Sequence, residues 1–427
     1  MRRVVGAVLL LVTLAACALP PETRSPPATS GPPVTSGPPA TPGPPTTSGS
    51  PTTSGPATPG PPTTSGPPAT SSGPSAGEPV DRGRPGDLDG DGYADLVFAS
   101  GDRLDVVRGS RTGLDPATRV SVPADRFRVW LISQSVHADL DADGYGDVVV
   151  HGGPPEGEMA PHVLWGGPQG VGLVPVRVGR KSLLHAVTGD FDGDGVADVA
   201  APASGRTALV LLYGPFTREG VPAREETRPS PSGGEFWRLA AGPIGAGRRT
   251  GLLVYEGDDG EQVASRLVRG PGEPVRRLNA GMASAFGDFD GDGREDVAVG
   301  DDGGRNNEPG FETEPPGVDR TLTVYYAGGR VESLRGAKGG AVAGDFDGDG
   351  DDDVAFGGFW PDTPSGPRLF RGGPGGLRDA GPIGAGRGLS PLTAGDYDGD
   401  GDDELVLASE KSVAVSDGRG AMRSFSR

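Results

Sequence analysis

Short runs rich in valine and leucine recur from about residue 81 to the end of the chain, and glycine, proline or aspartate bounds each of them. One run precedes each acidic segment, as in residues 183–191 and 339–346, and a second follows it, as in residues 147–152, 296–300 and 404–409. A third run and a weaker fourth complete the unit. Runs of this length and composition are typical of β-strands, and helix-period patterns of useful length are absent. The pattern predicts four strands in each unit.

The strand pattern repeats about every 50 residues, and repeats of this length indicate solenoids or propellers. An acidic motif, Asp-x-Asp-x-Asp-Gly-x-x-Asp or a close variant, begins at Asp87, Asp139, Asp190, Asp288, Asp345 and Asp396. Residues 243–251 (PIGAGRRTG) keep the frame of a seventh copy without any carboxylate. The steps are then 52, 51, 53, 45, 57 and 51 residues. Seven such units predict an all-β fold, a seven-bladed β-propeller with four-stranded blades over residues 81–427, because radial closure protects sheet edges.

An open array of the same units is the alternative arrangement. Closure is favoured because the last repeat continues through SVAVSDG and residues 421–427, which is enough for two more strands. Residues 77–86 can then supply at most an irregular first strand for the first blade. How that blade closes is left open by the sequence.

The first 16 residues form a different kind of segment. Two arginines precede an apolar run over residues 4–16, which is too short to span a bilayer and is typical of a secretory signal peptide. The only cysteine, Cys17, follows Leu-Ala-Ala and resembles the lipobox of bacterial lipoproteins, in which cleavage precedes lipidation of the cysteine. We expect a lipoprotein signal peptide over residues 1–16 and a lipidated Cys17. An ordinary signal peptide cut after Ala18 is the alternative.

Residues 17–80 are almost entirely Pro, Thr, Ser, Gly and Ala, with three charged residues and no aromatic ring. Such a segment cannot bury enough apolar surface to offset the entropy of ordering it. We therefore expect a disordered linker, which at about 3.1 Å per residue could reach on the order of 190 Å. Anchor and linker together predict an exported protein on the outer face of the cell membrane with an extracellular head.

Charge and cysteine content restrict the partners. The chain has 39 Lys and Arg against 58 Asp and Glu, a formal net charge of −19. Nucleic acids and anionic membrane surfaces need clustered positive charge, so we expect no nucleic-acid partner and contact with the membrane through the lipid anchor alone. A single cysteine excludes a disulfide framework and a zinc site built on several thiolates. We expect a monomeric head.

The acidic motif carries the ligands that Ca²⁺ prefers. Aspartates at positions 1, 3 and 5 point carboxylates into one concavity, glycine at position 6 permits a sharp turn, and the carbonyl at position 7 adds a neutral oxygen. The acid at position 9 closes the shell. Without a cation, four carboxylates this close would repel one another. The six intact loops predict about six Ca²⁺ ions, which would bring the formal charge from −19 to about −7.

An EF-hand is the obvious rival, because its loop begins with the same acidic spacing. That loop needs a glutamate at position 12 and a helix on either side. Position 12 is apolar in all six copies and lies within a predicted strand: Phe98, Val150, Ala201, Val299, Phe356 and Leu407. The EF-hand is therefore excluded, and ordinary acidic turns without metal are the remaining alternative.

The repeats resemble the FG-GAP and VCBS repeats of bacterial surface proteins and of the integrin α-subunit propeller. The resemblance covers residues 81–427 and implies calcium in the hairpin between the first two strands of a blade. The ligands that it implies, with the fourth of each set acting through its carbonyl, are Asp87, Asp89, Asp91, Tyr93 and Asp95; Asp139, Asp141, Asp143, Tyr145 and Asp147; Asp190, Asp192, Asp194, Val196 and Asp198; Asp288, Asp290, Asp292, Arg294 and Asp296; Asp345, Asp347, Asp349, Asp351 and Asp353; and Asp396, Asp398, Asp400, Asp402 and Glu404. The fourth loop cannot bind metal. The Gly-Ala-Pro signature of integrins is absent, so the resemblance extends to the fold and not to integrin function.

Recognition of a protein or glycan is the function expected of this architecture. Aromatic residues stand in segments predicted for the face opposite the calcium loops, namely Phe311 in residues 301–318, Trp360 in residues 359–367, and Phe236 and Trp237 near a blade junction. Exposed rings on a rigid scaffold suit such binding, whereas rings packed onto the blades would not.

A calcium-dependent glycan-acting enzyme, a lyase or hydrolase, is the alternative function. The chain has four histidines, and we expect His137 and His185 near the central channel, where they could act as an acid and a base. The other two are His151 and His162. A cysteine nucleophile is excluded, because Cys17 is lipidated or removed. No catalytic residue is assigned, and a wall-associated head without a dedicated ligand is a third option.

Overall fold

The computed structural model describes residues 86–129, 136–243, 249–257, 262–270, 273–305, 318–358, 366–383 and 388–427. These ranges belong to one compact unit, Ser72–Arg427. The predicted signal peptide, Cys17 and the linker over residues 17–80 lie outside them. Among the described residues no helix is both long and apolar enough to cross a membrane.

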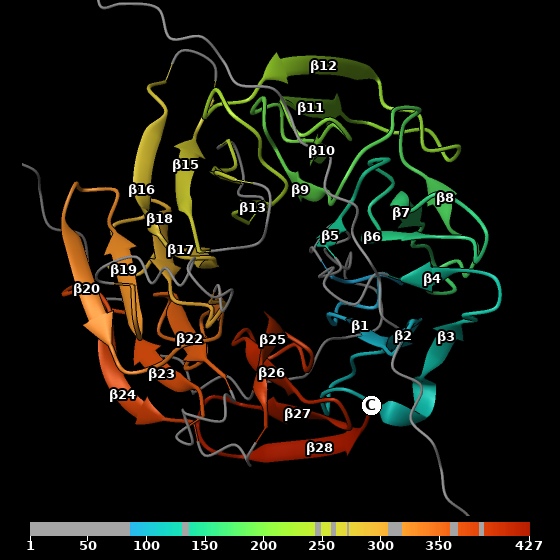
Figure 1. Cartoon of the computed structure of the whole chain (residues 1–427). Helices are drawn as coiled ribbons and strands as arrows, with labels where there is room; N and C mark the ends of the chain where they lie inside the picture. The colour runs from blue at the N-terminus through green and yellow to red at the C-terminus, as the bar shows by residue number, and fades with distance from the viewer. Residues whose placement is uncertain are drawn as a thin grey trace, which may run out of the picture. The chain divides into compact units, whose positions relative to one another are not determined.

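Seven antiparallel sheets stand around a central axis, in chain order (Figure 1). Blade 1 contains β1 (Leu96–Ser100), β2 (Arg103–Val107) and β3 (Val120–Val122), with the 3₁₀ turn η1 (Pro116–Thr118) before β3. Blade 2 contains β4 (Arg128–Val129), β5 (Val136–Ala138), β6 (Asp147–Gly153), β7 (Ala160–Leu164) and β8 (Val176–Arg177). Blade 3 contains β9 (Val187–Gly189), β10 (Asp198–Pro202), β11 (Ala208–Tyr213) and β12 (Arg224–Pro229).

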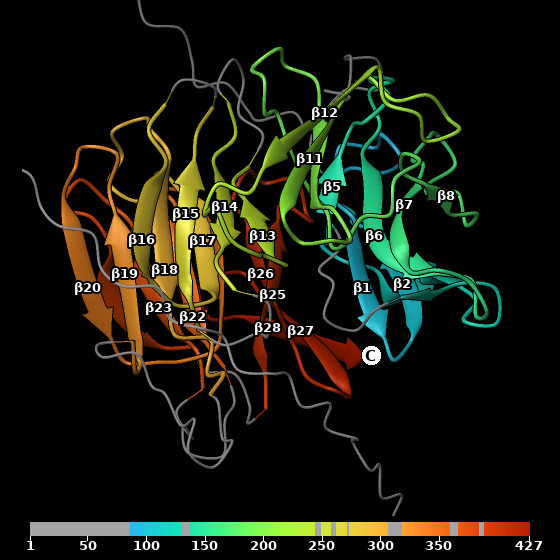
Figure 2. The same ribbon diagram turned by 45° about the horizontal axis from the view of Figure 1, so that its top comes forward.

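The remaining four blades have four strands each, as Figure 2 shows from a second angle. Blade 4 contains β13 (Leu239–Ala241), β14 (Leu252–Tyr255), β15 (Ala264–Val268) and β16 (Arg276–Ala280). Blade 5 contains β17 (Ala283–Gly287), β18 (Asp296–Gly300), β19 (Thr321–Tyr325) and β20 (Val331–Arg335). Blade 6 contains β21 (Gly340–Gly344), β22 (Asp353–Gly357), β23 (Arg368–Arg371) and β24 (Arg378–Pro382). Blade 7 contains β25 (Ser390–Gly395), β26 (Glu404–Ala408), β27 (Ser412–Ser416) and β28 (Met422–Ser426). The predicted all-β seven-bladed propeller is confirmed.

Two blades depart from four strands in the described part of the chain. In blade 2, β4 and β5 both pair with β6, so the innermost strand is in two pieces. In blade 1, the innermost strand would precede Gly86, outside the described residues. The carbonyl of Gly86 accepts a hydrogen bond from the amide of Asp95 at 2.7 Å. Gly344 pairs with Asp353 at the same register position in blade 6, so Gly86 stands where an innermost strand would end.

The core lies between the blades. The second strand of a blade is covered on both sides by its neighbours, and β6, β10 and β18 are buried at every residue. The outermost β12 instead alternates between exposed and half-buried positions. Seven apolar clusters pack the seams between neighbouring blades. Each acidic hairpin therefore leads directly into a buried second strand.

Among the described residues, the ring closes by the packing of blade 7 against blade 1. All four strands of blade 7 come from one continuous segment, so the closed arrangement replaces the open array. The amides of Ala94 and Ser110 donate to the carbonyls of Asp396 and Tyr397 at 2.9 and 3.0 Å. The ring of Phe425 lies 6.3 Å from that of Phe98 between centroids. These contacts show how blade 7 meets blade 1, which the sequence did not determine.

Candidate metal centres in the hairpin loops

In blades 2, 3, 5, 6 and 7 the acidic motif forms the hairpin between the first and second strands, as expected, and in blade 1 it leads into β1. We number these hairpins by blade: loop 1 (Asp87–Asp95), loop 2 (Asp139–Asp147), loop 3 (Asp190–Asp198), loop 4 (Pro243–Gly251), loop 5 (Asp288–Asp296), loop 6 (Asp345–Asp353) and loop 7 (Asp396–Glu404). The glycine at position 6 has a positive φ in every acidic loop, for example 90° at Gly350. A side chain at this backbone angle would be strained, which explains the glycine.

Backbone amides hold the carboxylates of positions 1 and 5 in place. In loop 6, Asp345 accepts hydrogen bonds from the amides of Gly348 at 2.8 Å, Asp349 at 3.1 Å and Gly350 at 2.9 Å. The bond from the position 6 amide to the position 1 carboxylate is present in all six acidic loops. In all six, the position 5 carboxylate accepts from the amide of position 7. Each hairpin therefore curls around its own acids.

The acid at position 9 is buried in all six loops and ties the loop to the sheet. One oxygen of Asp353 accepts from the amide of Phe346 at 3.2 Å, and the other accepts from the amide of Gly372, beyond β23, at 2.8 Å. The bond to the position 2 amide recurs in all six loops. Burial raises the pKa of Asp95 and Asp147 to about 7 and that of Glu404 to about 8. A bound cation would hold these acids ionised.

In four of the loops, the carboxylate at position 3 points one oxygen into the loop and the other toward an arginine outside it. The Oδ1 atoms of the position 3 acids are buried without a hydrogen-bond partner in Asp141, Asp192, Asp290 and Asp347. Their Oδ2 atoms form ion pairs with arginines, at 2.5 Å to Arg218, 2.7 Å to Arg224, 3.7 Å to Arg330 and 3.1 Å to Arg371. A buried charged oxygen without a partner is costly. The inner oxygen is therefore positioned for a ligand that supplies positive charge.

The outer arginines are a feature that the sequence analysis missed. Three come from later parts of the same blade, whereas Arg218 comes from the next blade; they lie 24 to 77 residues after the acid that they contact, so the motif gives no sign of them. Loop 1 differs in detail. Arg108 pairs with Asp89 there at 2.6 Å, while the other oxygen of Asp89 accepts weakly from the amide of Asp91 at 3.3 Å.

The acids of each loop converge to within metal-binding range. Three carboxylates offer oxygens within 4.8 Å of one another in six sets among the described residues, which include Asp87, Asp89 and Asp95; Asp139, Asp141 and Asp147; Asp190, Asp192 and Asp194; Asp288, Asp290 and Asp292; and Asp345, Asp347 and Asp349. The structure thus brings positions 1 and 3 together with position 9 in loops 1 and 2, and with position 5 in loops 3, 5 and 6. An all-oxygen donor set with a buried unpartnered oxygen fits a hard divalent cation such as Ca²⁺.

The side chain at position 7 crosses the preceding loop, and this was not predicted either. A Cβ on Gly90, at position 4 of loop 1, would lie 2.6 Å from the ring of Tyr145 in loop 2. A Cβ on Gly399 would lie 2.7 Å from the ring of Tyr93. Position 4 is glycine in five loops and alanine in loop 2, where Ala142 has a φ of 59°. Neighbouring loops therefore pack on one another around the ring.

Loop 4 has no carboxylate, and a neighbouring blade supplies one instead. Gly251 stands at position 9, and a Cβ there would lie 2.5 Å from Oε1 of Glu295, which belongs to blade 5. The same oxygen is 3.5 Å from the guanidinium of Arg269 at the end of β15. Arg269 also donates to the carbonyl of Glu295 at 3.0 Å. This seam is held by an ion pair where the other loops carry their acidic clusters.

The aromatic residues expected on the opposite face are only partly placed. Phe236 is fully buried against the apolar residues between blades 3 and 4, so the alternative of a ring packed onto the blades holds there. Trp237 is half-buried and packs against the apolar cluster between blades 4 and 5. Phe311 and Trp360 lie outside the described residues. An aromatic ring near a blade junction packs into the seam because burial there removes its apolar surface from water, which is favourable.

The histidines form one close pair. The rings of His151 and His185 lie 4.4 Å apart between centroids, and Trp237 meets His185 edge-on at 6.5 Å. Burial lowers the pKa of His151 to about 4 and also lowers the pKa of His185. His137 is half-buried beside Gly86, and its buried Nε2 lacks a hydrogen-bond partner among the described residues. His185 therefore meets His151, a pairing that the sequence analysis did not foresee.

Comparison with known proteins identifies the repeats. Residues 87–150 and 340–407 match the family model of the FG-GAP-like repeat. The chain therefore contains FG-GAP-like repeats on a seven-bladed propeller, a generic binding or scaffold module. No curated protein matches it. Among solved structures, it is similar to a chain described as the crystal structure of puromycin hydrolase, with 14% identity and a TM-score of 0.38. The alignment covers 79% of this chain and 54% of the hydrolase chain, so this chain spans about half the length of that solved structure.

Proposed function

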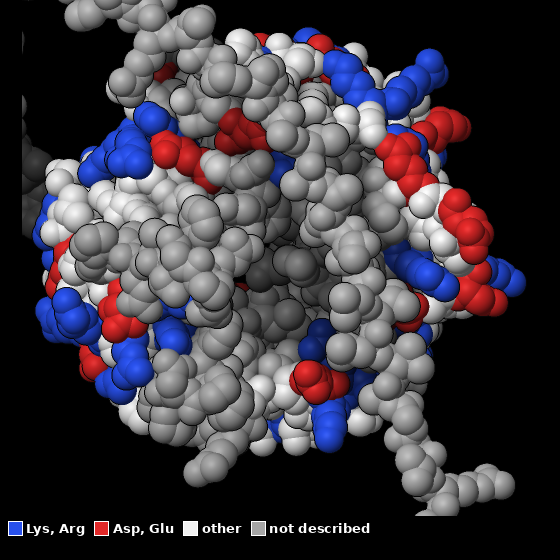
Figure 3. All heavy atoms as spheres, in the orientation of Figure 1, with Lys and Arg blue, Asp and Glu red and all other residues white. Residues whose placement is uncertain are grey.

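We propose that this protein is a calcium-binding β-propeller of the FG-GAP/VCBS type that a lipid on Cys17 holds at the outer face of the cell membrane, where its head binds a protein or a glycan. The calcium sites are the six acidic loops. The lipid anchor and surface display rest on the sequence of residues 1–80. On the face seen in Figure 3, acidic and basic side chains alternate around the rim, which favours a partner other than nucleic acid.

The observation that carries the calcium proposal is the inward oxygen of position 3. The same atom, Oδ1, is buried and unpartnered in loops 2, 3, 5 and 6, and its sister oxygen is paired with an arginine in each. Because the same energetically costly unpartnered oxygen recurs in four loops, we infer that all four loops bind the same kind of ligand. Calcium would satisfy the inner oxygen, while the arginine fixes the orientation of the carboxylate from outside.

Calorimetric titration of the metal-depleted full chain with Ca²⁺ tests the proposal. We expect heat from about six sites. The variant Asp192→Asn should lose one site, and the control Glu225→Gln, an exposed acid on β12 of the same blade, should lose none. Absence of heat at millimolar calcium, or equal uptake by Asp192→Asn and wild type, would refute the proposal.

The anchor has its own test. Mass spectrometry of the mature chain should find residue 17 as the first residue, carrying the mass of a lipid. Cys17→Ala should leave the head folded and release it from the membrane fraction. A mature chain that begins after Ala18 without lipid would refute the anchor and leave the calcium proposal standing.

A glycan-acting enzyme is the second candidate, and the His151–His185 pair favours it. Both imidazoles have a lowered pKa because they are buried, so both are neutral at pH 7 and able to accept a proton. Nδ1 of His151 is buried without a hydrogen-bond partner. Turnover on a panel of polysaccharides that His185→Gln abolishes would support this candidate. Inactivity of the wild type across the panel would count against it.

A further inference from the structure

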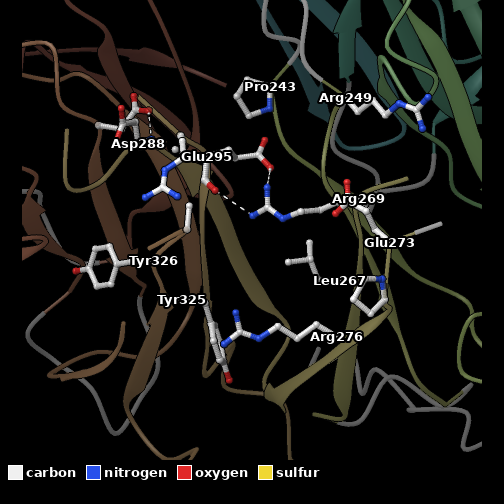
Figure 4. Close-up of a pocket in the computed structure, with 15 residues that line it drawn as sticks. Pro243, Arg249, Leu267, Arg269, Glu273, Arg276, Asp288, Glu295, Tyr325 and Tyr326 are labelled. Carbon is white, nitrogen blue, oxygen red and sulfur yellow. Dashed lines mark hydrogen bonds and ion pairs between the residues drawn. The ribbon is translucent and has the colours of Figure 1, made fainter. Parts of the chain in front are cut away.

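A cavity of about 540 Å³ lies between blades 4 and 5, beside loop 4 (Figure 4). Arg269 and Glu295 meet near its middle, and Tyr325 with Arg276 forms one side. Leu267 adds an apolar surface. The volume falls within the range of small-molecule sites, about 300 to 1,000 Å³.

The cavity belongs to the seam whose loop has lost its acids. Pro243, at position 1 of loop 4, lines the cavity and carries no amide hydrogen and no carboxylate. With no acid at position 9 of its own loop, Arg269 pairs with Glu295 across the seam at 3.5 Å. The departure of one repeat from the metal-binding pattern therefore coincides with a lined cavity.

Donors and acceptors stand side by side on the wall of this cavity. The Arg276 guanidinium lies 4.9 Å from the centre of the Tyr325 ring and has no carboxylate partner among the described residues. Glu273, also on the wall, forms no side-chain hydrogen bond or ion pair within the same part of the chain. Tyr325 is fixed by Asn279, whose side-chain oxygen accepts from its hydroxyl at 2.8 Å. A simple anion would be repelled by Glu273, whereas a hydroxyl-rich anion would use both groups.

We propose that this cavity binds a carboxylated sugar of one or two units. The planar guanidinium of Arg276 donates two parallel hydrogen bonds to the sugar carboxylate. Glu273 accepts from ring hydroxyls, and Leu267 with Pro274 covers the apolar face of the sugar. This proposal deepens the glycan-binding part of the proposed function and does not depend on the anchor.

Calorimetry of the full chain at saturating calcium tests the site, because Asp288 also lines the cavity and calcium in loop 5 would neutralise it. The probes are the disaccharide of galacturonic acid, its neutral galactose counterpart and a tri-glutamate peptide. We expect the acidic disaccharide to bind at least ten times more tightly than either of the others. Arg276→Gln should weaken that binding at least tenfold.

The matched control is Arg277→Gln. Arg277 is the next residue of β16, its side chain is 60% exposed, and it pairs with Glu256 on the opposite face of the strand. The Arg277→Gln variant should bind the acidic disaccharide as tightly as wild type does. Equal binding by Arg276→Gln and wild type, tighter binding of the peptide, or no uptake of any probe by chain that takes up calcium normally would overturn the sugar site. In each case the calcium proposal stands, because calcium uptake is measured on the same samples.

Discussion

Replacing the position 3 aspartate of loop 6 with its uncharged isostere should destabilise the protein in calcium and hardly at all without it. In Asp347, Oδ1 is buried without a partner, and Oδ2 lies 3.1 Å from Arg371. Asp347→Asn keeps the shape and removes the charge. Without calcium, the lost ion pair, about 0–1 kcal/mol for a partly exposed pair, is offset by weaker repulsion from the neighbouring acids.

With calcium the arithmetic changes. A ligand that binds only the native state stabilises it by RT ln(1 + [L]/Kd), which is about 2.7 kcal/mol at a free concentration of 100 Kd. If Asp347→Asn abolishes binding to its loop, this whole contribution is lost. In calcium, the free energy of unfolding of the variant should therefore be about 2.7 kcal/mol lower than that of wild type. In chelator, the variant should unfold at nearly the same denaturant concentration as wild type.

Denaturant unfolding in 1 mM calcium and in EGTA measures both numbers. The control is Asp379→Asn, an acid of β24 in the same blade whose ion pair with Arg368 at 2.6 Å is remote from the loop. Its small effect should be the same with and without calcium. Equal destabilisation of Asp347→Asn in both buffers would show that the carboxylate has a structural role only, and the reasoning would fail.

Four further substitutions test the packing and the pH dependence. Gly90→Ala, which forces a Cβ against the Tyr145 ring at a φ of 75°, should cost about 1–3 kcal/mol in thermal unfolding. Ala142→Gly, at the equivalent position of loop 2, should not destabilise. Phe425→Ala, which removes the half-buried ring packed on Phe98 at the closure, should cost about 1–2 kcal/mol and speed proteolysis of blade 7. His151→Gln should reduce acid sensitivity: because the pKa of folded His151 is about 4, its contribution is complete above pH 6.5 and falls below that, by about 2 kcal/mol at pH 5. Indistinguishable slopes of stability against pH below 6.5 for His151→Gln and wild type would contradict this assignment.

The sequence predicted best what local pattern determines. The apolar run after loop 5, residues 296–300, coincides with β18, and the expected last strand within residues 421–427 is β28. Second strands are sandwiched between blades and read as unbroken apolar runs. Outer strands do not: the run over residues 173–179 yields only the two residues of β8. Exposed edges carry mixed side chains, so hydrophobicity marks their limits poorly.

Features that depend on neighbours in space could not be predicted. The requirement for glycine at position 4 of loop 1 comes from Tyr145 in the next blade, more than 50 residues away. The arginines that pair with position 3 acids also lie outside the motif, and Arg218 comes from the following blade. Phe236 is aromatic and stands near a junction, yet only the assembled seam shows that it is buried. The acidic spacing gave the candidate ligands, whereas the second layer that orients them arises from the fold.

The most direct measurement is the amount of calcium that the full chain retains. After equilibrium dialysis at a defined free calcium concentration, elemental analysis should find about six ions per chain, and one fewer in Asp347→Asn. A chain that retains no calcium at millimolar concentrations, or an unchanged number in the variant, would contradict the account.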